Sequence, residues 1–153
     1  MNYRLCQPGD FAQLYAIEEV CFEPPLRFPR AYMRQTVNSP LAATWVAEDS
    51  ESLAGFAIVR SLEETAGQIA YIETIEVAAS YRKQGIGGEL LKRVEESARA
   101  AGAMSIWLHV DEENATAIRL YEAHRYEKKG REEKYYARRR AALIYSKLLS
   151  AER

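Results

Sequence analysis

The segment Arg82-Lys83-Gln84-Gly85-Ile86-Gly87-Gly88 has the residue types and spacing that point most directly to chemistry. Apolar residues recur at spacings of three and four after it, so we expect Gly85 to open a helix. The first turn of a helix has free backbone N–H groups and the positive end of the helix dipole, and glycines let an anion approach closely. The segment therefore predicts a phosphate-binding loop. Arg82 and Lys83 are candidates for further contacts with the phosphates.

Two common phosphate-binding loops do not fit this segment. A Walker P-loop needs Gly-Lys-Ser/Thr where this chain has Gly87-Gly88-Glu89. The Rossmann fingerprint begins Gly-x-Gly, whereas Lys83 stands two residues before Gly85. The run before the loop, residues 68–77, is rich in β-branched and aromatic residues and predicts a strand. The expected unit is thus a strand, a glycine loop and a helix.

The loop resembles the acyl-CoA pyrophosphate loop of the GNAT N-acetyltransferases, whose pattern is Arg/Gln-x-x-Gly-x-Gly/Ala. A second motif of that family, Asn-x-x-Ala-x-x-Leu-Tyr, stands here as residues 114–121, after the strand motif Trp107-Leu108-His109-Val110. The narrower resemblance is to protein N-terminal acetyltransferases, meaning the bacterial ribosomal-protein alanine acetyltransferases and related eukaryotic catalytic subunits. It rests on Ala70-Tyr71-Ile72-x-Thr74, Leu108-His109-Val110 and Lys134-Tyr135-Tyr136.

This resemblance, strongest over residues 69–126, implies one GNAT domain over residues 1–153. The fold class it implies is α/β, with a mixed, mostly antiparallel sheet, splayed central strands and helices on both faces. The cofactor that the resemblance implies is acetyl-CoA. Its pantetheine arm carries amide groups, which can form hydrogen bonds with an exposed strand edge as a peptide does. The cofactor-binding groups carried over are the strand backbone at Ile75, Glu76 and Val77, the loop 82–88, Asn114 and Tyr121.

The family's reaction is attack of a neutral amine on a thioester, which needs a proton acceptor for the amine and a proton donor for the thiolate. By resemblance, Tyr121 is the general acid, and Asn114 contacts the cofactor while its residue type predicts a helix N-cap. His109 is the candidate base, because an imidazole titrates near neutrality, and Tyr71 helps to order the catalytic water. Glu73 is an alternative base, although an unperturbed surface glutamate is the interpretation we prefer for it.

The resemblance also implies a slot for an extended peptide between two loops. The acceptor it predicts is therefore the N-terminal α-amine of a protein or peptide, with ribosomal proteins among the candidates. The substrate-binding residues it implies are Phe22, Pro24, Leu26, Glu73, Tyr135 and Tyr136. Arg138-Arg139-Arg140 follows directly, and we favour solvated charge over selection of acidic substrates for this run.

Two other functions stay open. A GNAT enzyme for a small amine, an antibiotic or a lysine side chain predicts a deep, acidic pocket instead of a tyrosine-lined slot. An acyl-CoA-binding sensor without turnover has no reason to keep both Tyr121 and His109. The presence of this pair therefore favours an enzyme.

Composition agrees with a soluble globular domain: the 153 residues are 48% hydrophobic and 28% charged. A net charge of -1 gives no general attraction to nucleic acid or membrane, so we expect neither as a partner. Cys6 and Cys21 predict buried thiols, and we expect no metal. The apolar runs are too short for a membrane span or a signal peptide, which predicts a cytoplasmic protein, either a monomer or a weak homodimer.

Local signals predict the remaining elements. We expect strands at 3–6, 44–48, 55–60, 105–110, 126–130 and 142–149, and helices at 11–21, 29–37 and 115–123. Asp10 is the predicted N-cap of the first of these helices, and Pro29 the first residue of the second. Arg125 stands where the family has glycine. It predicts either a changed helix exit or an arginine in the left-handed conformation.

Overall fold

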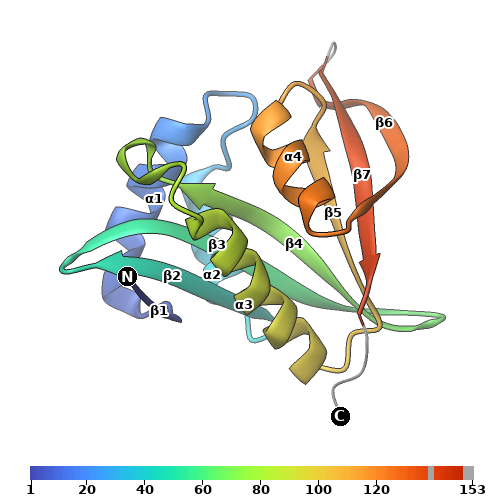
Figure 1. Ribbon diagram of the computed structural model, residues 1–153, viewed down its shortest axis with the longest axis horizontal. Coiled ribbons are helices and arrows are strands. Elements are labelled where there is room, and N and C mark those ends of the chain that lie inside the picture. The colour runs from blue at the N-terminus through green and yellow to red at the C-terminus, as the bar shows by residue number, and fades with distance from the viewer. Residues whose placement is uncertain (138–139, 150–153) are drawn as a thin grey trace.

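The computed structural model describes residues 1–137 and 140–149, so Arg138 and Arg139 of the arginine run lie outside the described residues. Its elements are β1 (Asn2–Leu5), η1 (Pro8–Asp10), α1 (Phe11–Cys21), α2 (Arg30–Val37), β2 (Ala42–Asp49), β3 (Ser52–Glu64), β4 (Gly67–Val77), η2 (Ala79–Tyr81), α3 (Ile86–Ala100), β5 (Ser105–Asp111), α4 (Ala115–Ala123), β6 (Glu127–Ala137) and β7 (Arg140–Leu148). Helices separate β1 from β2, β4 from β5 and β5 from β6, whereas β2, β3 and β4 follow one another directly, as do β6 and β7 (Figure 1).

The strands form one sheet in the order β1-β2-β3-β4-β5-β7-β6. The pair β4 and β5 is parallel, and the other neighbouring pairs are antiparallel. Helices α3 and α4 pack on one face, while α1 and α2 pack on the other (Figure 1). This arrangement confirms the mixed, mostly antiparallel sheet with helices on both faces.

Each face of the sheet has its own apolar core. The stripe predicted on α3 is buried, with Leu90, Leu91 and Val94 all 0% exposed. On the other face, Leu14 of α1 packs with Phe56 of β3. Burial of a leucine side chain stabilises a fold by about 1.5–3 kcal/mol, so these two layers hold β3 and β4 between them.

The sheet opens between β4 and β5. Their pairing runs from Ile69 opposite Ser105 to Ile72 opposite Leu108 and ends there. On the other side of β4, Val59 pairs with Ile72 and Ile58 with Thr74, so Glu73 is the extra residue of a β-bulge. A bulge bends its strand, and β4 turns away from β5 just beyond this point (Figure 1). The predicted splay of the central strands is thus confirmed.

Several local predictions need correction. Strand β1 begins and ends one residue earlier than expected, and Pro29 is the N-cap of α2 instead of its first residue. Asp10 precedes α1 but does not cap it. Its carboxylate instead accepts hydrogen bonds from the Gln7 N–H and from Arg4, each at 2.7 Å. The full charge of the guanidinium competes better for this carboxylate than the neutral N–H groups of α1.

Two further expectations differ in degree. Strand β6 extends through Ala137, well beyond the predicted 126–130, so the two tyrosines at 135 and 136 stand on a strand and not in a turn. Cys6 and Cys21 are free thiols that remain partly exposed, where the sequence predicted full burial.

The end of α4 confirms one of the two outcomes predicted for Arg125. Its φ is +70°, which is the left-handed conformation that glycine adopts without strain. The N–H of Tyr126 donates to the carbonyl of Tyr121 at 3.0 Å, so the helix ends as it would with a glycine at this position. The arginine therefore bears the backbone strain itself.

This strain predicts that Arg125→Gly stabilises the protein. A non-glycine residue in the left-handed region costs about 1–2 kcal/mol, and the greater unfolded-chain entropy of glycine offsets part of that gain. We expect the free energy of unfolding in urea to rise by about 0.5–1 kcal/mol. Arg119→Gly is the matched control, because the exposed Arg119 lies inside α4 and its replacement should destabilise by about 1 kcal/mol. If both variants changed the free energy of unfolding equally, Arg125 would not be under backbone strain.

Gly55 of β3 lies where the backbone of β4 comes closest. A Cβ atom at this position would stand 2.5 Å from the Glu76 carbonyl oxygen and 3.3 Å from the Val77 Cα atom. Neither backbone atom can yield without moving β4. A glycine at residue 55 is therefore what allows the separated end of β4 to lie where it does.

We predict that Gly55→Ala lowers the free energy of unfolding by about 1–3 kcal/mol, because the methyl group overpacks this contact. It should also weaken acetyl-CoA binding, since it displaces the backbone at residues 75–77. Chemical denaturation and calorimetric titration with acetyl-CoA measure the two effects. Gly9→Ala, where the added methyl meets open space, serves as the control. If Gly55→Ala were as stable as wild type, the backbone of β4 would be able to move away from the added methyl group, and the prediction would be wrong.

Candidate active site

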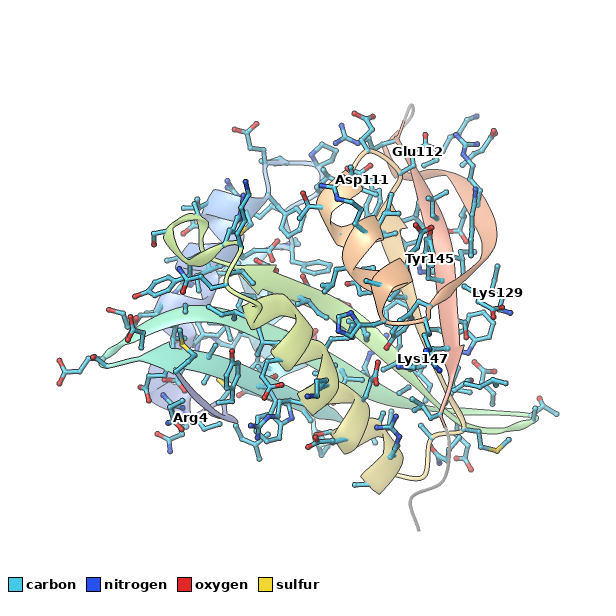
Figure 2. The ribbon with its side chains drawn as sticks, in the orientation of Figure 1. Arg4, Asp111, Glu112, Lys129, Tyr145 and Lys147 are labelled. Atoms are coloured by element: carbon cyan, nitrogen blue, oxygen red, sulfur yellow. The ribbon has the colours of Figure 1, made fainter. Side chains whose placement is uncertain are left out.

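A narrow cavity of about 70 Å³ lies where β4 and β5 separate. Its walls come from α1 and the loop after it, from both separated strands, from α4 and from β6. The lining residues are Glu18, Phe22, Leu26, Phe28, Ile72, Glu73, Thr74, Ile75, His109, Val110, Asp111, Asn114, Ala117, Tyr121 and Tyr136. The far end of β5, with Asp111 and Glu112, lies beside the start of α4 (Figure 2).

The candidate acid Tyr121 enters the cavity from α4. The residue is 5% exposed, and its ring packs against Tyr126 with the centroids 5.6 Å apart. Burial raises the pKa of the Tyr121 phenol well above its ordinary value. Tyr121 therefore keeps its proton at neutral pH, as a proton donor must.

Asn114 confirms its predicted place at the start of α4. Its Oδ1 accepts a hydrogen bond from the Ala117 N–H at 3.1 Å, which satisfies one free donor of the first turn. Asn114 also lines the cavity. One side chain thus both caps the helix that carries Tyr121 and faces the site.

The candidate base His109 lies on β5 within a group of aromatic rings. Its Nδ1 is 2.7 Å from the Tyr71 Oη, and the Tyr135 ring stacks on the imidazole at 4.2 Å with an angle of 3° between the planes. Its Nε2 is buried and has no hydrogen-bond partner among the described residues, with Glu132 Oε1 3.7 Å away.

These contacts define the tautomer in which His109 can act as a base. Only an imidazole with its proton on Nδ1 leaves a lone pair on Nε2, so the Nδ1–H must then donate to the Tyr71 oxygen. Burial raises the pKa of the Tyr71 phenol far above its usual value, so Tyr71 stays neutral and serves through this hydrogen bond. The hydrogen bond between Tyr71 and His109 thus links β4 to β5 next to Ile72 and Leu108, where the pairing of the two strands ends.

Glu73 is not the unperturbed surface glutamate that the sequence favoured. Its side chain is 5% exposed, and its Oε1 accepts from Arg60 Nε at 2.8 Å while its Oε2 accepts from the Tyr32 hydroxyl at 3.1 Å. The bulge at Glu73 turns the side chain toward these partners on β3 and α2. Because both oxygens are occupied and one is paired with a cation, Glu73 is a weaker candidate base than His109.

The glycine loop has the backbone geometry that the sequence predicted. Gly85 is the N-cap of α3 with a φ of +79°, and the first bond of the helix runs from the Glu89 N–H to the Gly85 carbonyl. The N–H groups of the residues between them point out of the helix start. A side chain on Gly88 would meet the His124 ring at 3.3 Å, so this glycine allows the end of α4 to pack closely against the start of α3. A Cβ atom on Gly85 would meet no atom within 4 Å, so the open side of the loop lies at Gly85.

The side chains of the glycine loop differ in their exposure and direction. Lys83 and Gln84 are exposed, and Ile86 is buried in the core, so only its backbone faces the loop. Arg82 turns back toward the end of β4, where its Nε donates to the Val77 carbonyl at 3.2 Å and its Nη2 lies 3.7 Å from Cys21 Sγ. The guanidinium of Arg82 therefore forms a hydrogen bond with the last residue of β4 and also lies next to the glycine loop.

The residues expected to bind the acceptor are only partly brought together. Phe22, Leu26, Glu73 and Tyr136 line the cavity, whereas Pro24 is exposed and Tyr135 covers the His109 ring. Burial raises the pKa of the Tyr136 phenol, which keeps it protonated as a hydrogen-bond donor. Arg140 donates to both oxygens of Asp111, at 3.0 and 2.8 Å, so its charge is used within the chain.

Sequence reasoning missed two carboxylates at this site. Glu18 is not among the predicted site residues, although a charged residue on the apolar stripe between Ile17 and Cys21 is itself a signal. The structure buries Glu18 completely, at 0% exposure, in the cavity wall. Glu76 was carried over for its backbone alone, yet its side chain is also buried, at 3% exposure.

Within residues 1–137 and 140–149, no group of three or more His, Cys, Asp or Glu side chains is arranged to hold a metal ion. None of the helices in these ranges has the length and apolar character needed to cross a membrane.

A strand edge opened beside a glycine-capped helix, with a tyrosine and a histidine facing the opening, defines an acyl-CoA-binding transferase site. Residues 11–126 match the acetyltransferase (GNAT) family, and the chain belongs to that family. It is thus an acetyl-CoA-dependent N-acetyltransferase domain. Streptothricin acetyltransferase of Streptomyces lavendulae is 42% identical over 79 residues, 51% of this chain and 41% of that protein. The chain spans less than half the length of the curated relatives it matches.

Solved structures share the whole fold at low sequence identity. NAA60 of Arabidopsis thaliana, in complex with a bisubstrate analogue, superposes with a TM-score of 0.86 at 24% identity and covers 99% of both chains. The ribosomal-protein-S18-alanine N-acetyltransferase of Escherichia coli gives a TM-score of 0.84 at 22% identity, covering 99% of this chain and 96% of that one. The same Arabidopsis protein has also been solved with acetyl-CoA.

Proposed function

We propose that this chain transfers an acetyl group from acetyl-CoA to the N-terminal α-amine of a protein or peptide, by direct attack within a ternary complex. The observation that carries this proposal is the pair formed by Tyr71 and His109, 2.7 Å apart, in which His109 lines the same cavity as the buried, protonated Tyr121. A base and an acid at one opening of the sheet match the two proton transfers that the reaction needs.

Acetyl-CoA, when bound, supplies the thioester carbon that the amine attacks. The backbone at residues 75–77 would hold the pantetheine arm, and the N–H groups at the start of α3 would hold the pyrophosphate. His109 Nε2 accepts the ammonium proton, directly or through one water, which frees the nitrogen lone pair. The new C–N bond would form as the C–S bond breaks, with Tyr121 giving its proton to the departing sulfur. The second proton that the amide nitrogen must lose would then return to the Tyr121 oxygen, directly or through one water.

The shape of the acceptor side supports a peptide. The cavity is narrow, and Phe22, Leu26 and Tyr136 line it, which suits an extended chain end more than a bulky side chain. One chain with this fold is named as an N-acetyltransferase for alanine of ribosomal protein S18. A ribosomal protein is accordingly among the acceptors to test. We also infer a cytoplasmic protein, monomeric or weakly dimeric, which gel filtration would examine.

A second candidate is acetylation of a small cationic amine such as an antibiotic. The buried Glu18 in the cavity wall supports it, because a negative charge in an apolar cavity attracts a cation. The 42% identity to streptothricin acetyltransferase over 79 residues supports it as well. The two candidates share the chemistry and differ in the acceptor.

Release of CoA thiol in the presence of acetyl-CoA separates these candidates. The acceptors to compare are N-terminal peptides beginning with Ala, Ser or Met, the same peptides with a blocked N-terminus and an internal lysine, and small amines including streptothricin. Turnover on free α-amines alone is the expected result. Preferred turnover on small amines or internal lysines would overturn the N-terminal proposal, and acetyl-CoA binding without turnover on any acceptor would indicate a sensor.

A further inference from the structure

Two buried carboxyl groups face one another beneath the separated end of β4. Glu18 comes from α1 and is 0% exposed, and Glu76 comes from β4 and is 3% exposed. Glu18 forms part of the cavity wall. Two ionised carboxylates side by side in a protein interior repel each other and lose their hydration, so such a pair needs a compensating arrangement.

The hydrogen bonds of the pair indicate what that arrangement is. Glu18 Oε2 accepts from the Phe28 N–H at 2.9 Å, and Glu76 Oε2 accepts from the Thr74 hydroxyl at 2.8 Å. The other oxygen of each carboxyl, Oε1 in both, is buried without a partner among the described residues. A single proton shared between these two oxygens would satisfy both, so the pair holds one proton and one negative charge.

The surroundings decide which residue holds the proton. Burial first, and then the hydrogen bond and charge of Glu18, raise the pKa of Glu76 well above its ordinary value, and Cys21 adds to this. Tyr121 of α4 lies near Glu76 and is a neutral phenol. The guanidinium of Arg82 contacts Cys21 Sγ and forms no ion pair with either carboxyl group. Glu76 is therefore the protonated partner, and Glu18 is the member of the pair that lines the cavity.

Glu18 is also the carboxylate in the cavity wall that lacks a cation. Of the three acidic side chains there, Glu73 pairs with Arg60 and Asp111 pairs with Arg140. Among the described residues no lysine, arginine or histidine pairs with Glu18 or Glu76. The other walls near Glu18 are Phe22, Leu26 and Phe28, which leave its charge weakly screened.

We propose that the Glu18–Glu76 pair is the recognition site for the positive charge of the acceptor, with Glu18 attracting the ammonium group and Glu76 holding Glu18 in place through the shared proton. This inference rests on the proposed acetylation of an amine, whether a peptide N-terminus or a small amine. Both residues act by positioning the acceptor; the proton transfers stay with His109 and Tyr121.

Removing the charge should weaken acceptor binding selectively. We expect Glu18→Gln to raise the KM for the amine about tenfold relative to Glu76→Gln. An amide in place of the Glu76 carboxyl still donates a hydrogen bond to Glu18, whereas an amide in place of the Glu18 carboxylate carries no charge. The probes are an Ala-initiated hexapeptide, compared with its Nα-acetylated form, and 1,5-diaminopentane, compared with its diacetylated form, so that each comparison removes the positive charge of the amine. Glu19→Gln, exposed and one residue along α1, is the matched control.

Three readouts separate this role from a structural one. Calorimetry with CoA should give similar Kd values for Glu18→Gln and wild type, and the acetylated probes should bind both proteins alike. If Glu18→Gln weakens CoA or the neutral probes as much as the amines, or leaves the amine KM at the wild-type value, the proposal is overturned. Turnover of the diamine alone would refute the N-terminal proposal while still allowing this test.

A measurement on the unaltered protein covers the case in which a variant fails to fold. Carboxyl carbon NMR of glutamate-labelled protein in complex with CoA should show one buried glutamate that titrates well above the range of the others, and one that stays ionised beside it. Ordinary titration of both Glu18 and Glu76 would show that no proton is shared and would overturn the proposal.

Discussion

Replacing Tyr121 by phenylalanine is expected to lower kcat for acetyl transfer by about 100- to 1000-fold, the contribution typical of a positioned general acid. The phenol is the buried proton donor of the cavity, and phenylalanine keeps its ring packing against Tyr126 while removing only the hydroxyl. The Kd for acetyl-CoA should change far less than kcat. Thiol release at saturating acceptor and calorimetric titration with acetyl-CoA give the two numbers.

Tyr126→Phe is the control for this experiment. Its hydroxyl donates to Glu95 at 2.8 Å on the core side, so its loss should lower stability by about 1 kcal/mol without a comparable fall in kcat. Because the pKa of Tyr121 is raised, its acid form persists through the neutral range, and Tyr121 should add no alkaline limb to the rate there. A Tyr121 variant with kcat near that of wild type would remove it as the acid.

Replacing His109 by alanine should lower kcat/KM by about 100- to 1000-fold, because the cavity then lacks a group that can accept the ammonium proton at neutral pH. Glutamine cannot accept a proton, so His109→Gln should also lose most of the activity. Thiol release at increasing acceptor concentration and saturating acetyl-CoA measures kcat/KM for both variants.

Two neighbouring variants test the same assignment. Tyr71→Phe removes the oxygen that accepts the Nδ1 proton of His109, so we expect a fall of about tenfold in kcat/KM, the value of one hydrogen bond to the reactive side chain. Glu73→Gln keeps the shape of the residue bonded to Arg60 and Tyr32 and removes its charge. If Glu73→Gln abolishes turnover and His109→Gln keeps most of it, Glu73 is the base.

Much of the candidate site follows from short segments of sequence. The glycine loop, the strand before it and the helix after it occupy neighbouring residues, so local propensity and spacing are enough to predict them. The same holds for Asn114 as the cap of α4 and for the strained Arg125. Their positions depend on backbone geometry within one or two turns of chain.

The failed or missing predictions concern contacts between distant segments. Asp10 seemed a helix cap until the fold brought Arg4 against it, and Glu73 seemed a surface residue until a bulge in β4 turned it toward Arg60 and Tyr32. Such contacts depend on how distant strands and helices pair in the fold. The sequence pattern of one segment does not show which residues of another segment will lie opposite it.

The order of elements, the glycine loop, the acid and base candidates and the family depend on residue types at short, fixed spacings, so the amino-acid sequence was enough to predict them. Pairing between distant segments was needed to place the separation of β4 and β5 after Ile72 and Leu108. It was also needed to bring Glu18 of α1 to Glu76 of β4. Burial, with Glu18 beside it, raises the pKa of Glu76, and only the folded chain brings these two residues together.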